Sequence, residues 1–202
     1  MFTRFSPGTT VLLVHVASMP VFISMLRGVN VGGHNRVNMT ELSALYESLG
    51  FDTPRTYVQS GNVIFRTSEK NAASISKKIQ DGIERTFGFR PAVVLRTAPE
   101  LKKAIDTNPF AGRRDIVPGK LLVTFLAADP GPDGLRRLAA FKSHPEELHL
   151  KGSELYIYFP NGAGRSKLPW SSVEKLVGVT GTARNWNSVS KILEIAVELA
   201  ES

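Results

Sequence analysis

The sequence of 202 residues contains no cysteine, which excludes structural disulfides, thiolate catalysis and cysteine-ligated metal sites. Histidine is scarce as well, and no two histidines have the spacing of a helical zinc pair, so no metal site is predicted. The four histidines are His15, His34, His144 and His149. Long apolar runs are lacking: the early run from Val11 to Val16 is too short for a membrane span or a secretory signal. We therefore expect a cytoplasmic protein without a membrane anchor.

What is present is an ordinary globular balance, with 42% hydrophobic and 21% charged residues, so disorder is not expected. The formal net charge of +7 favours anionic partners, although it equally suits a basic protein that is merely soluble. A strand pattern begins just after Met19, and Met19 itself is a candidate for an alternative initiator methionine. Residues 1–18 are therefore predicted to be an extension outside the fold.

After Met19, the apolar spacing predicts the order βαββαβ, which is that of a ferredoxin-like unit or α/β plait. The predicted elements are a strand at 21–26, a helix from Asn38 to Gly50, strands at 56–59 and 62–66, a helix at 72–87 and a strand at 92–96. Ser60 and Gly61 are predicted to connect the middle strands as a two-residue hairpin turn. Gln59 then projects from the sheet face beside Tyr57.

The second half repeats this order without repeating the residues. It contains predicted strands at 121–127, 147–150 and 155–159, helices at 134–141 and around 173–177, an extended segment at 179–183 and a closing helix at 188–200. We expect an α+β fold of two tandem ferredoxin-like subdomains with a linking helix and a C-terminal helix. The first subdomain with its linking helix covers 19–107, a linker loop 108–119, and the second subdomain 120–202.

Two loops rich in glycine and asparagine, the first from Arg27 to Asn35 and the second from Pro160 to Lys167, follow strands and precede helices, where backbone N–H groups can face an anion. The first loop lacks the G-x-G-x-x-G spacing and the second lacks the Walker lysine position, so neither matches a phosphate-binding motif. The candidate ligand-binding residues in them are Arg27, Gly28, Asn30, Gly32, Gly33, Asn161, Gly162, Gly164, Arg165, Ser166 and Lys167. A structural alternative is open for both: the glycines supply positive φ, and Ser166 caps a helix.

Two further segments contain polar side chains that simple turns do not need. The candidates there are Gln59, Ser60, Asn62, Arg184, Asn185, Trp186 and Asn187. A buried Gln59 amide would need hydrogen-bond partners. The alternatives are that Asn62 favours a turn, that Asn187 opens the last helix and that Trp186 fills the core, rather than offering a stacking surface for a base.

The segments that begin at Leu26, Thr56, Asn108, Pro160 and Arg184 read LRGVNVGG, TYVQSGNV, NPF, PNGAGRSKL and RNWN. In this order they resemble the landmark motifs of the bacterial family catalogued as domain of unknown function 1697. The resemblance runs from about Met19 to the C-terminus and implies a single-chain α+β protein of two plait-like halves. It implies no activity. His34 stands where the family pattern suggests lysine.

Three functions remain open from the sequence. The first is a binding module for a small anion, such as a phosphate or a nucleotide, in a cleft between the halves. The alternative is an RNA or single-strand binder that uses an open sheet face, with Tyr156 and Tyr158 as stacking residues. A weaker alternative is a phosphotransfer or hydrolytic enzyme that uses Arg165, Ser166 and Lys167. No catalytic constellation is recognisable, so a binding protein is favoured over an enzyme, and no cofactor is indicated.

Overall fold

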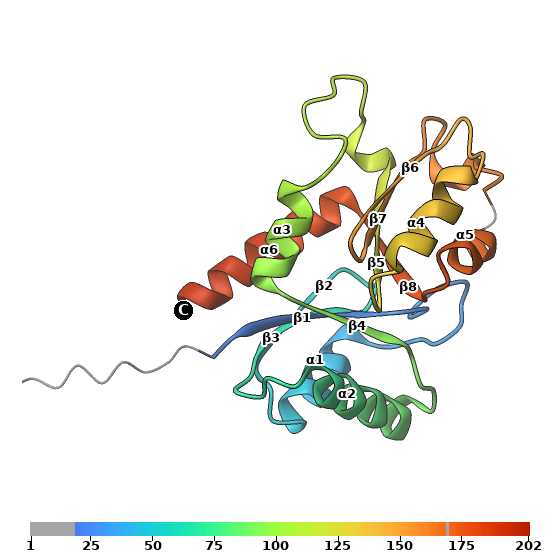
Figure 1. Cartoon of the computed structure of the whole chain (residues 1–202). Helices are drawn as coiled ribbons and strands as arrows, with labels where there is room; N and C mark the ends of the chain where they lie inside the picture. Colours follow the sequence, from blue (N-terminus) through green and yellow to red (C-terminus); the bar gives the residue numbers. More distant parts are fainter. Residues whose placement is uncertain (1–18, 169) are drawn as a thin grey trace, which may run out of the picture.

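The computed structural model describes residues 19–168 and 170–202 (Figure 1). The extension predicted at 1–18 lies outside the described residues. No helix in the described part of the chain is long and apolar enough to cross a membrane.

The first half forms a four-stranded sheet in the order β2-β3-β1-β4, and every neighbouring pair is antiparallel. Its elements are β1 (Val21–Leu26), α1 (Met39–Ser48), β2 (Asp52–Tyr57), β3 (Asn62–Arg66), α2 (Ala72–Phe87) and β4 (Val93–Thr97). Helices α1 and α2 lie side by side on the outer face of this sheet (Figure 1). Phe65 is fully buried beneath them.

The second half forms a second four-stranded antiparallel sheet, in the order β6-β7-β5-β8. Its elements are β5 (Leu121–Leu126), α4 (Gly131–Ala140), β6 (Glu147–Lys151), β7 (Glu154–Tyr158), α5 (Trp170–Val177) and β8 (Gly181–Asn185), preceded by the short 3-10 turn η1 (Pro118–Lys120). The order of elements and the order of strands therefore match those of the first half.

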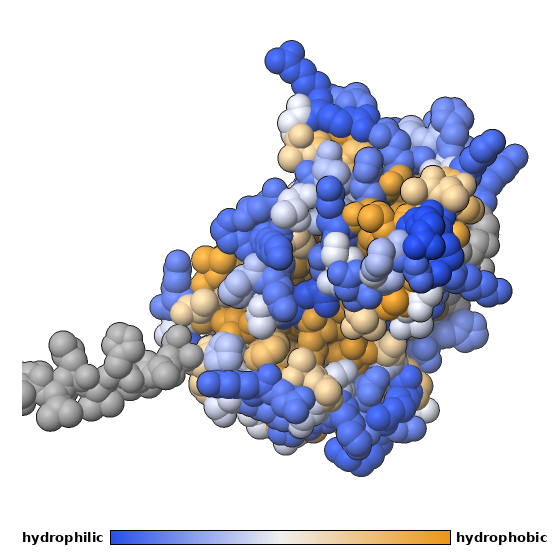
Figure 2. Space-filling model, in the orientation of Figure 1, coloured by the Kyte–Doolittle hydropathy of each residue, from blue (hydrophilic) through white to orange (hydrophobic). Residues whose placement is uncertain are grey.

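The inner faces of the two sheets share one core with α3 (Ala98–Asp106) and α6 (Trp186–Glu201). Hydrophobic atoms are visible along the seam between the halves, whereas hydrophilic side chains cover much of the outer helices (Figure 2). Tyr156 is fully buried in this core, and its hydroxyl donates to the Ala104 carbonyl at 2.6 Å. Tyr158 is buried too. The alternative interpretation, in which these tyrosines are stacking residues on an open sheet face, is therefore wrong.

Local sequence signals explain most element ends. The Asn38 side chain accepts hydrogen bonds from the N–H groups of Thr40 and Glu41 and so caps α1. After α1, Gly50 adopts a φ of 79°, which favours glycine and ends the helix. Thr97 and Glu100 form a reciprocal capping box at the start of α3.

The hairpin between β2 and β3 differs from the prediction. Tyr57 pairs with Asn62, so the connection has the four residues from Val58 to Gly61 instead of two. The strand β2 begins at Asp52 and ends at Tyr57, because Val58 adopts a positive φ of 49°. Gln59 therefore lies in the turn, where it is exposed, and the predicted place on the sheet face is wrong.

Candidate functional site

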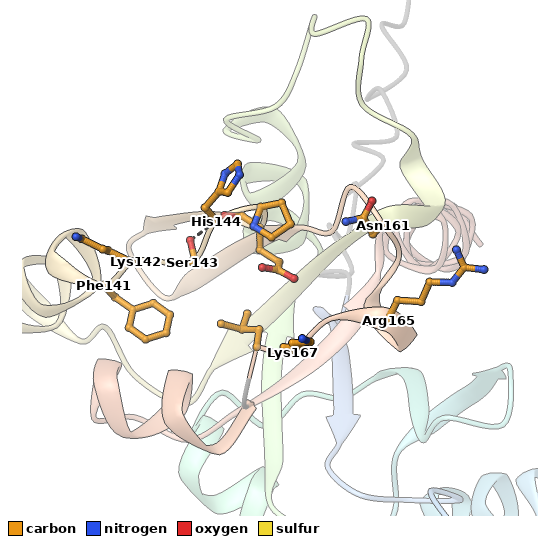
Figure 3. Close-up of a pocket in the computed structure, with 10 residues that line it drawn as sticks. Phe141, Lys142, Ser143, His144, Asn161, Arg165 and Lys167 are labelled. Carbon is orange, nitrogen blue, oxygen red and sulfur yellow. Dashed lines mark hydrogen bonds between the residues drawn. The ribbon is translucent and has the colours of Figure 1, made fainter.

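A cavity of about 330 Å³ lies beside the loop that follows β7 (Figure 3). We call it the basic pocket. Its walls come from two segments: the connection between α4 and β6, and the loop between β7 and α5. The lining residues are Phe141, Lys142, Ser143, His144, Pro145, Glu146, Asn161, Arg165, Lys167 and Leu168. Three of the predicted site residues, Asn161, Arg165 and Lys167, are among them.

The charges of the basic pocket are mainly positive. Figure 3 shows Lys142 and Arg165 toward opposite sides of the view, with Lys167 between them. All three cations are exposed, and among the described residues none of them forms an ion pair. Glu146 is the single carboxylate of the lining, and it accepts a hydrogen bond from the Ser166 hydroxyl. The pocket therefore carries unneutralised positive charge.

Ser166 is occupied by structural contacts. Its hydroxyl donates to Glu146 and accepts from the Leu168 N–H at 3.0 Å, and it does not line the basic pocket. Helix α5 begins at Trp170, so Ser166 is not its N-cap, and that interpretation is wrong. Ser166 instead ends the short 3-10 turn η2 (Ala163–Arg165), in a loop where Gly162 has a φ of 84°. The serine holds the two walls of the pocket together.

The first loop is stabilised mainly by its own asparagines. The Asn30 amide donates to the carbonyls of Val37 and Gln59 at 3.0 and 2.9 Å, and its oxygen accepts from the Val37 N–H at 2.9 Å. Gly28, Gly32 and Gly33 all have positive φ, from 60° to 81°. These contacts and angles fit the alternative in which the glycines and asparagines of the first loop stabilise a turn and bind no ligand. Arg27 is also occupied, because its guanidinium bonds Glu174 of α5 at 2.7 and 2.8 Å.

A separate cavity of about 440 Å³ lies against the first loop. Asn30, Gly33 and Gln59 line it together with three neighbouring residues. Among the described cavities, none is lined by residues of both loops. Residues of the two candidate loops therefore line different cavities.

Arg184 is buried at the contact between the halves, where all five of its N–H groups meet oxygen atoms. It donates to the Asn62 side chain of the first half, and to the carbonyls of Leu26 at 2.9 Å and Ser60 at 3.0 Å. Within its own strand it donates to Thr182 Oγ1 at 2.7 Å and to the Ala183 carbonyl at 2.8 Å. Burial lowers the pKa of the guanidinium to about 10, which leaves it charged at neutral pH.

Arg96 makes the reciprocal contact. It lies in β4, the last strand of the first half, and donates to Glu154 at 2.9 Å and to the Leu126 carbonyl at 2.9 Å. Leu126 ends β5 as Leu26 ends β1. We call Arg96 and Arg184 the arginine clamp, because each half inserts one buried arginine into the other. Three predicted site residues, Ser60, Asn62 and Arg184, thus meet in a structural contact.

The segment after Arg184 begins the last helix. Asn185 is the N-cap of α6, accepts from the Asn187 N–H at 3.0 Å and donates to the Gly119 carbonyl at 2.8 Å. The interpretation of Asn187 as the cap is therefore wrong by two residues. Trp186 packs partly buried against the central core and also lines a mainly apolar cavity of about 350 Å³.

Lys142, His144 and Glu146 also line the basic pocket, but they were not among the site residues predicted from the sequence. A topological signal could have found them. In a sheet where β6 and β5 both pair antiparallel with β7, the connection before β6 and the connection after β7 reach the same end of the sheet. The segment from Phe141 to Glu146 is thereby brought to the loop that holds Arg165.

Two four-stranded antiparallel sheets with six helices in the described residues define a mixed α/β protein. The chain belongs to the family described as "Protein of unknown function (DUF1697)", whose model matches residues 19–156. The suspected family is thus confirmed. The match begins at Met19, and the motifs at Pro160 and Arg184 lie beyond it.

A solved structure resembles this fold over most of its length. It is that of the conserved bacterial protein SP0830 from Streptococcus pneumoniae, with 22% identity and a TM-score of 0.64. The similarity covers 89% of this chain and 99% of the other, and at this identity it concerns the fold alone. No curated protein matches the chain.

Proposed function

We propose that the protein binds a small phosphate-bearing molecule in the basic pocket. The observation that carries the proposal is that Lys142, Arg165 and Lys167 line one cavity without an ion pair to any described residue. Like charges gathered around a hollow repel one another, and a bound anion removes that repulsion. The Asn161 side chain adds an uncharged hydrogen-bond donor to the same wall.

The rest of the lining favours a ligand with an organic part. Phe141, Pro145 and Leu168 form an apolar portion of the same cavity. Ligand sites commonly combine apolar walls with a few polar groups that fix orientation. A phosphate ester, such as a nucleotide or a sugar phosphate, satisfies both portions, whereas inorganic phosphate uses only the cations.

We also infer that each half is a ferredoxin-like unit. The βαββαβ order and the antiparallel strand order β2-β3-β1-β4, repeated as β6-β7-β5-β8, support that inference. A bacterial cytoplasmic setting remains part of the proposal, based on the similarity to a bacterial protein and on an early apolar run that is too short for a secretory signal.

A thermal-shift panel tests the proposed ligand class. The probes are inorganic phosphate, adenosine monophosphate, glucose 6-phosphate and a short single-stranded oligonucleotide. A ligand that binds only the native state raises the melting temperature by mass action. We expect a rise with at least one phosphate ester that disappears in the double variant Arg165→Ala/Lys167→Ala.

The matched control is Lys70→Ala/Arg114→Ala, which removes the same charge from two exposed residues that do not line the basic pocket. This control should keep the ligand-induced rise. Equal loss in both double variants would mean that net charge alone attracts the anion, and the proposed pocket would be refuted. A rise with the oligonucleotide alone, steeply reduced by salt, would favour a nucleic-acid binder instead.

A further inference from the structure

The two arginines of the clamp are equivalent by position but differ in their surroundings. Val94 pairs with Met25 of β1 in the first sheet, as Thr182 pairs with Phe125 of β5 in the second. Arg96 and Arg184 each follow two residues later. This equivalence permits a direct comparison of the two sides of the molecule.

Arg184 donates all five of its N–H groups, and none of the described cavities is lined by it. Arg96 differs on both counts. Its Nη1 has one partner among the described residues, the Leu95 carbonyl at 2.8 Å, so one N–H is left over. Arg96 is only 8% exposed and lines a cavity of about 450 Å³. The remaining N–H of Arg96 is therefore available to an acceptor that enters this cavity.

The cavity beside Arg96, which we call the junction pocket, is lined by both halves. The remaining lining residues are Glu100, Lys103, Thr107, Asp129, Lys151, Gly152, Ser153 and Glu154. The formal charges of this lining cancel, with three cations and three carboxylates. The junction pocket therefore differs from the basic pocket, where positive charge dominates.

Apart from Arg96 and Glu154, the charged side chains that line the junction pocket form no ion pairs with one another. Lys103 and Lys151 form no ion pair with any described residue, although carboxylates line the same cavity. Asp129 uses one oxygen to accept from the Gly131 N–H, and Glu100 uses one oxygen in the capping box of α3. The second oxygen of each carboxylate has no partner among the described residues.

We propose that the junction pocket binds a small zwitterion, that is, a molecule with both a carboxylate and an ammonium group, such as a free amino acid or a dipeptide. The ligand carboxylate meets Arg96 and the Lys151 ammonium, and the ligand ammonium meets Asp129. A dianionic phosphate fits less well, because the lining has no net positive charge to balance it. This site is independent of the basic pocket, and each proposal can fail without the other.

Ligand-observed saturation-transfer NMR tests the proposal with the full chain. The probes are glycine, L-alanine, L-serine and glycylglycine, each paired with analogues that carry one charge, such as propionate and L-alaninamide for L-alanine. We expect at least one zwitterion to bind roughly tenfold more tightly than either of its single-charge analogues, since each lost charged contact costs about one power of ten.

Two variants test whether the zwitterion binds in the junction pocket. Asp129→Asn and Lys151→Gln should each weaken the binding roughly tenfold, with melting temperatures close to that of the parent protein because both side chains are exposed. The matched control is Lys191→Gln, at the position of α6 equivalent to Lys103 of α3, which should bind as the parent does. The proposal is overturned by any of three results: no binding of the four zwitterions, propionate binding as tightly as L-alanine, or zwitterion binding that survives both rim variants.

Discussion

Replacing Arg184 with methionine should destabilise the protein strongly, although the site of the change lies far along the chain from most of its contacts. Methionine keeps much of the aliphatic stem but removes five donors. The acceptors that lose a partner include the side chain of Asn62 and the carbonyls of Leu26 and Ser60, all in the other half. The clamp thus contributes to the docking of the two halves rather than to one strand alone.

The magnitude follows from burial. Asn62 is fully buried and Leu26 is 1% exposed, so water does not replace the lost donor at either oxygen, and the Leu26 carbonyl keeps only a long hydrogen bond of 3.5 Å from the Thr182 hydroxyl. An unsatisfied buried acceptor costs about 1–3 kcal/mol, which gives roughly 2–6 kcal/mol for these two oxygens. The range counts only those two oxygens, because Ser60 is only partly buried and the remaining acceptors, Thr182 Oγ1 and the Ala183 carbonyl, belong to β8 itself. Release of the desolvation cost of the buried charge offsets part of the loss, so a value near the lower end is expected.

Urea unfolding monitored by circular dichroism and by tryptophan fluorescence measures the effect. Arg114→Met, at an exposed residue, removes the same charge and should change the free energy of unfolding by less than about 0.5 kcal/mol. Arg184→Lys retains the charge but has three donors instead of a planar fork, so it should also destabilise the protein. If Arg184→Met or Arg184→Lys unfolds at the parent's urea concentration, the argument that the hydrogen-bonded fork holds the halves together is refuted.

Two further predictions concern a turn and a buried hydroxyl. Gly61→Ala should cost more than Gly88→Ala in urea unfolding, because both glycines have positive φ but a Cβ at Gly61 would lie 2.8 Å from Leu26 Cβ, whereas at Gly88 it meets nothing. We expect about 1–2 kcal/mol at Gly88 and roughly 1–3 kcal/mol more at Gly61, and equal costs would refute the clash. Burial raises the pKa of the Tyr46 hydroxyl above its usual 10.0, so its contribution to stability is complete below about pH 10 and is lost at higher pH, as the unfolded chain ionises first. Tyr46→Phe should therefore flatten the fall in melting temperature above pH 10, and an unchanged slope would contradict the assignment.

Much of the architecture could be predicted from residue periodicity. The helix from Met39 to Ser48 ends where Gly50 indicates, and the strand from Asn62 to Arg66 has the predicted bounds. The errors lie where tertiary contacts decide. The four-residue hairpin before Asn62 depends on positive φ at Val58, a β-branched residue for which no local rule predicts it. Asn185 and Asn187 have the same side chain, so capping chemistry alone does not tell which of them begins the last helix. The backbone turns helical at Trp186, which makes Asn185 the cap.

The site was harder to predict because loops were grouped by composition. Asn30 and Arg165 lie in similar glycine-rich loops, yet the first loop follows β1 and the second follows β7. In the second sheet, β5 is the equivalent of β1, and β7 is antiparallel to β5. The loop that follows β7 therefore lies at the opposite end of its sheet from the end at which the loop after β1 lies in the first sheet. Asn30 accordingly meets the β2–β3 hairpin at Gln59, whereas Arg165 meets the connection that contains Lys142. Strand direction, not loop composition, determines which loops can share a pocket.

In the proposed function, the basic pocket attracts phosphate groups. A titration with adenosine monophosphate, followed by backbone amide shifts in ¹H–¹⁵N correlation spectra at constant ionic strength, tests it most directly. We expect saturable shifts in residues 141–146 and 161–168, and little change in the loop from Gly28 to Asn35. Shifts confined to that first loop, or shifts that grow without saturation and are reproduced by chloride, would contradict it.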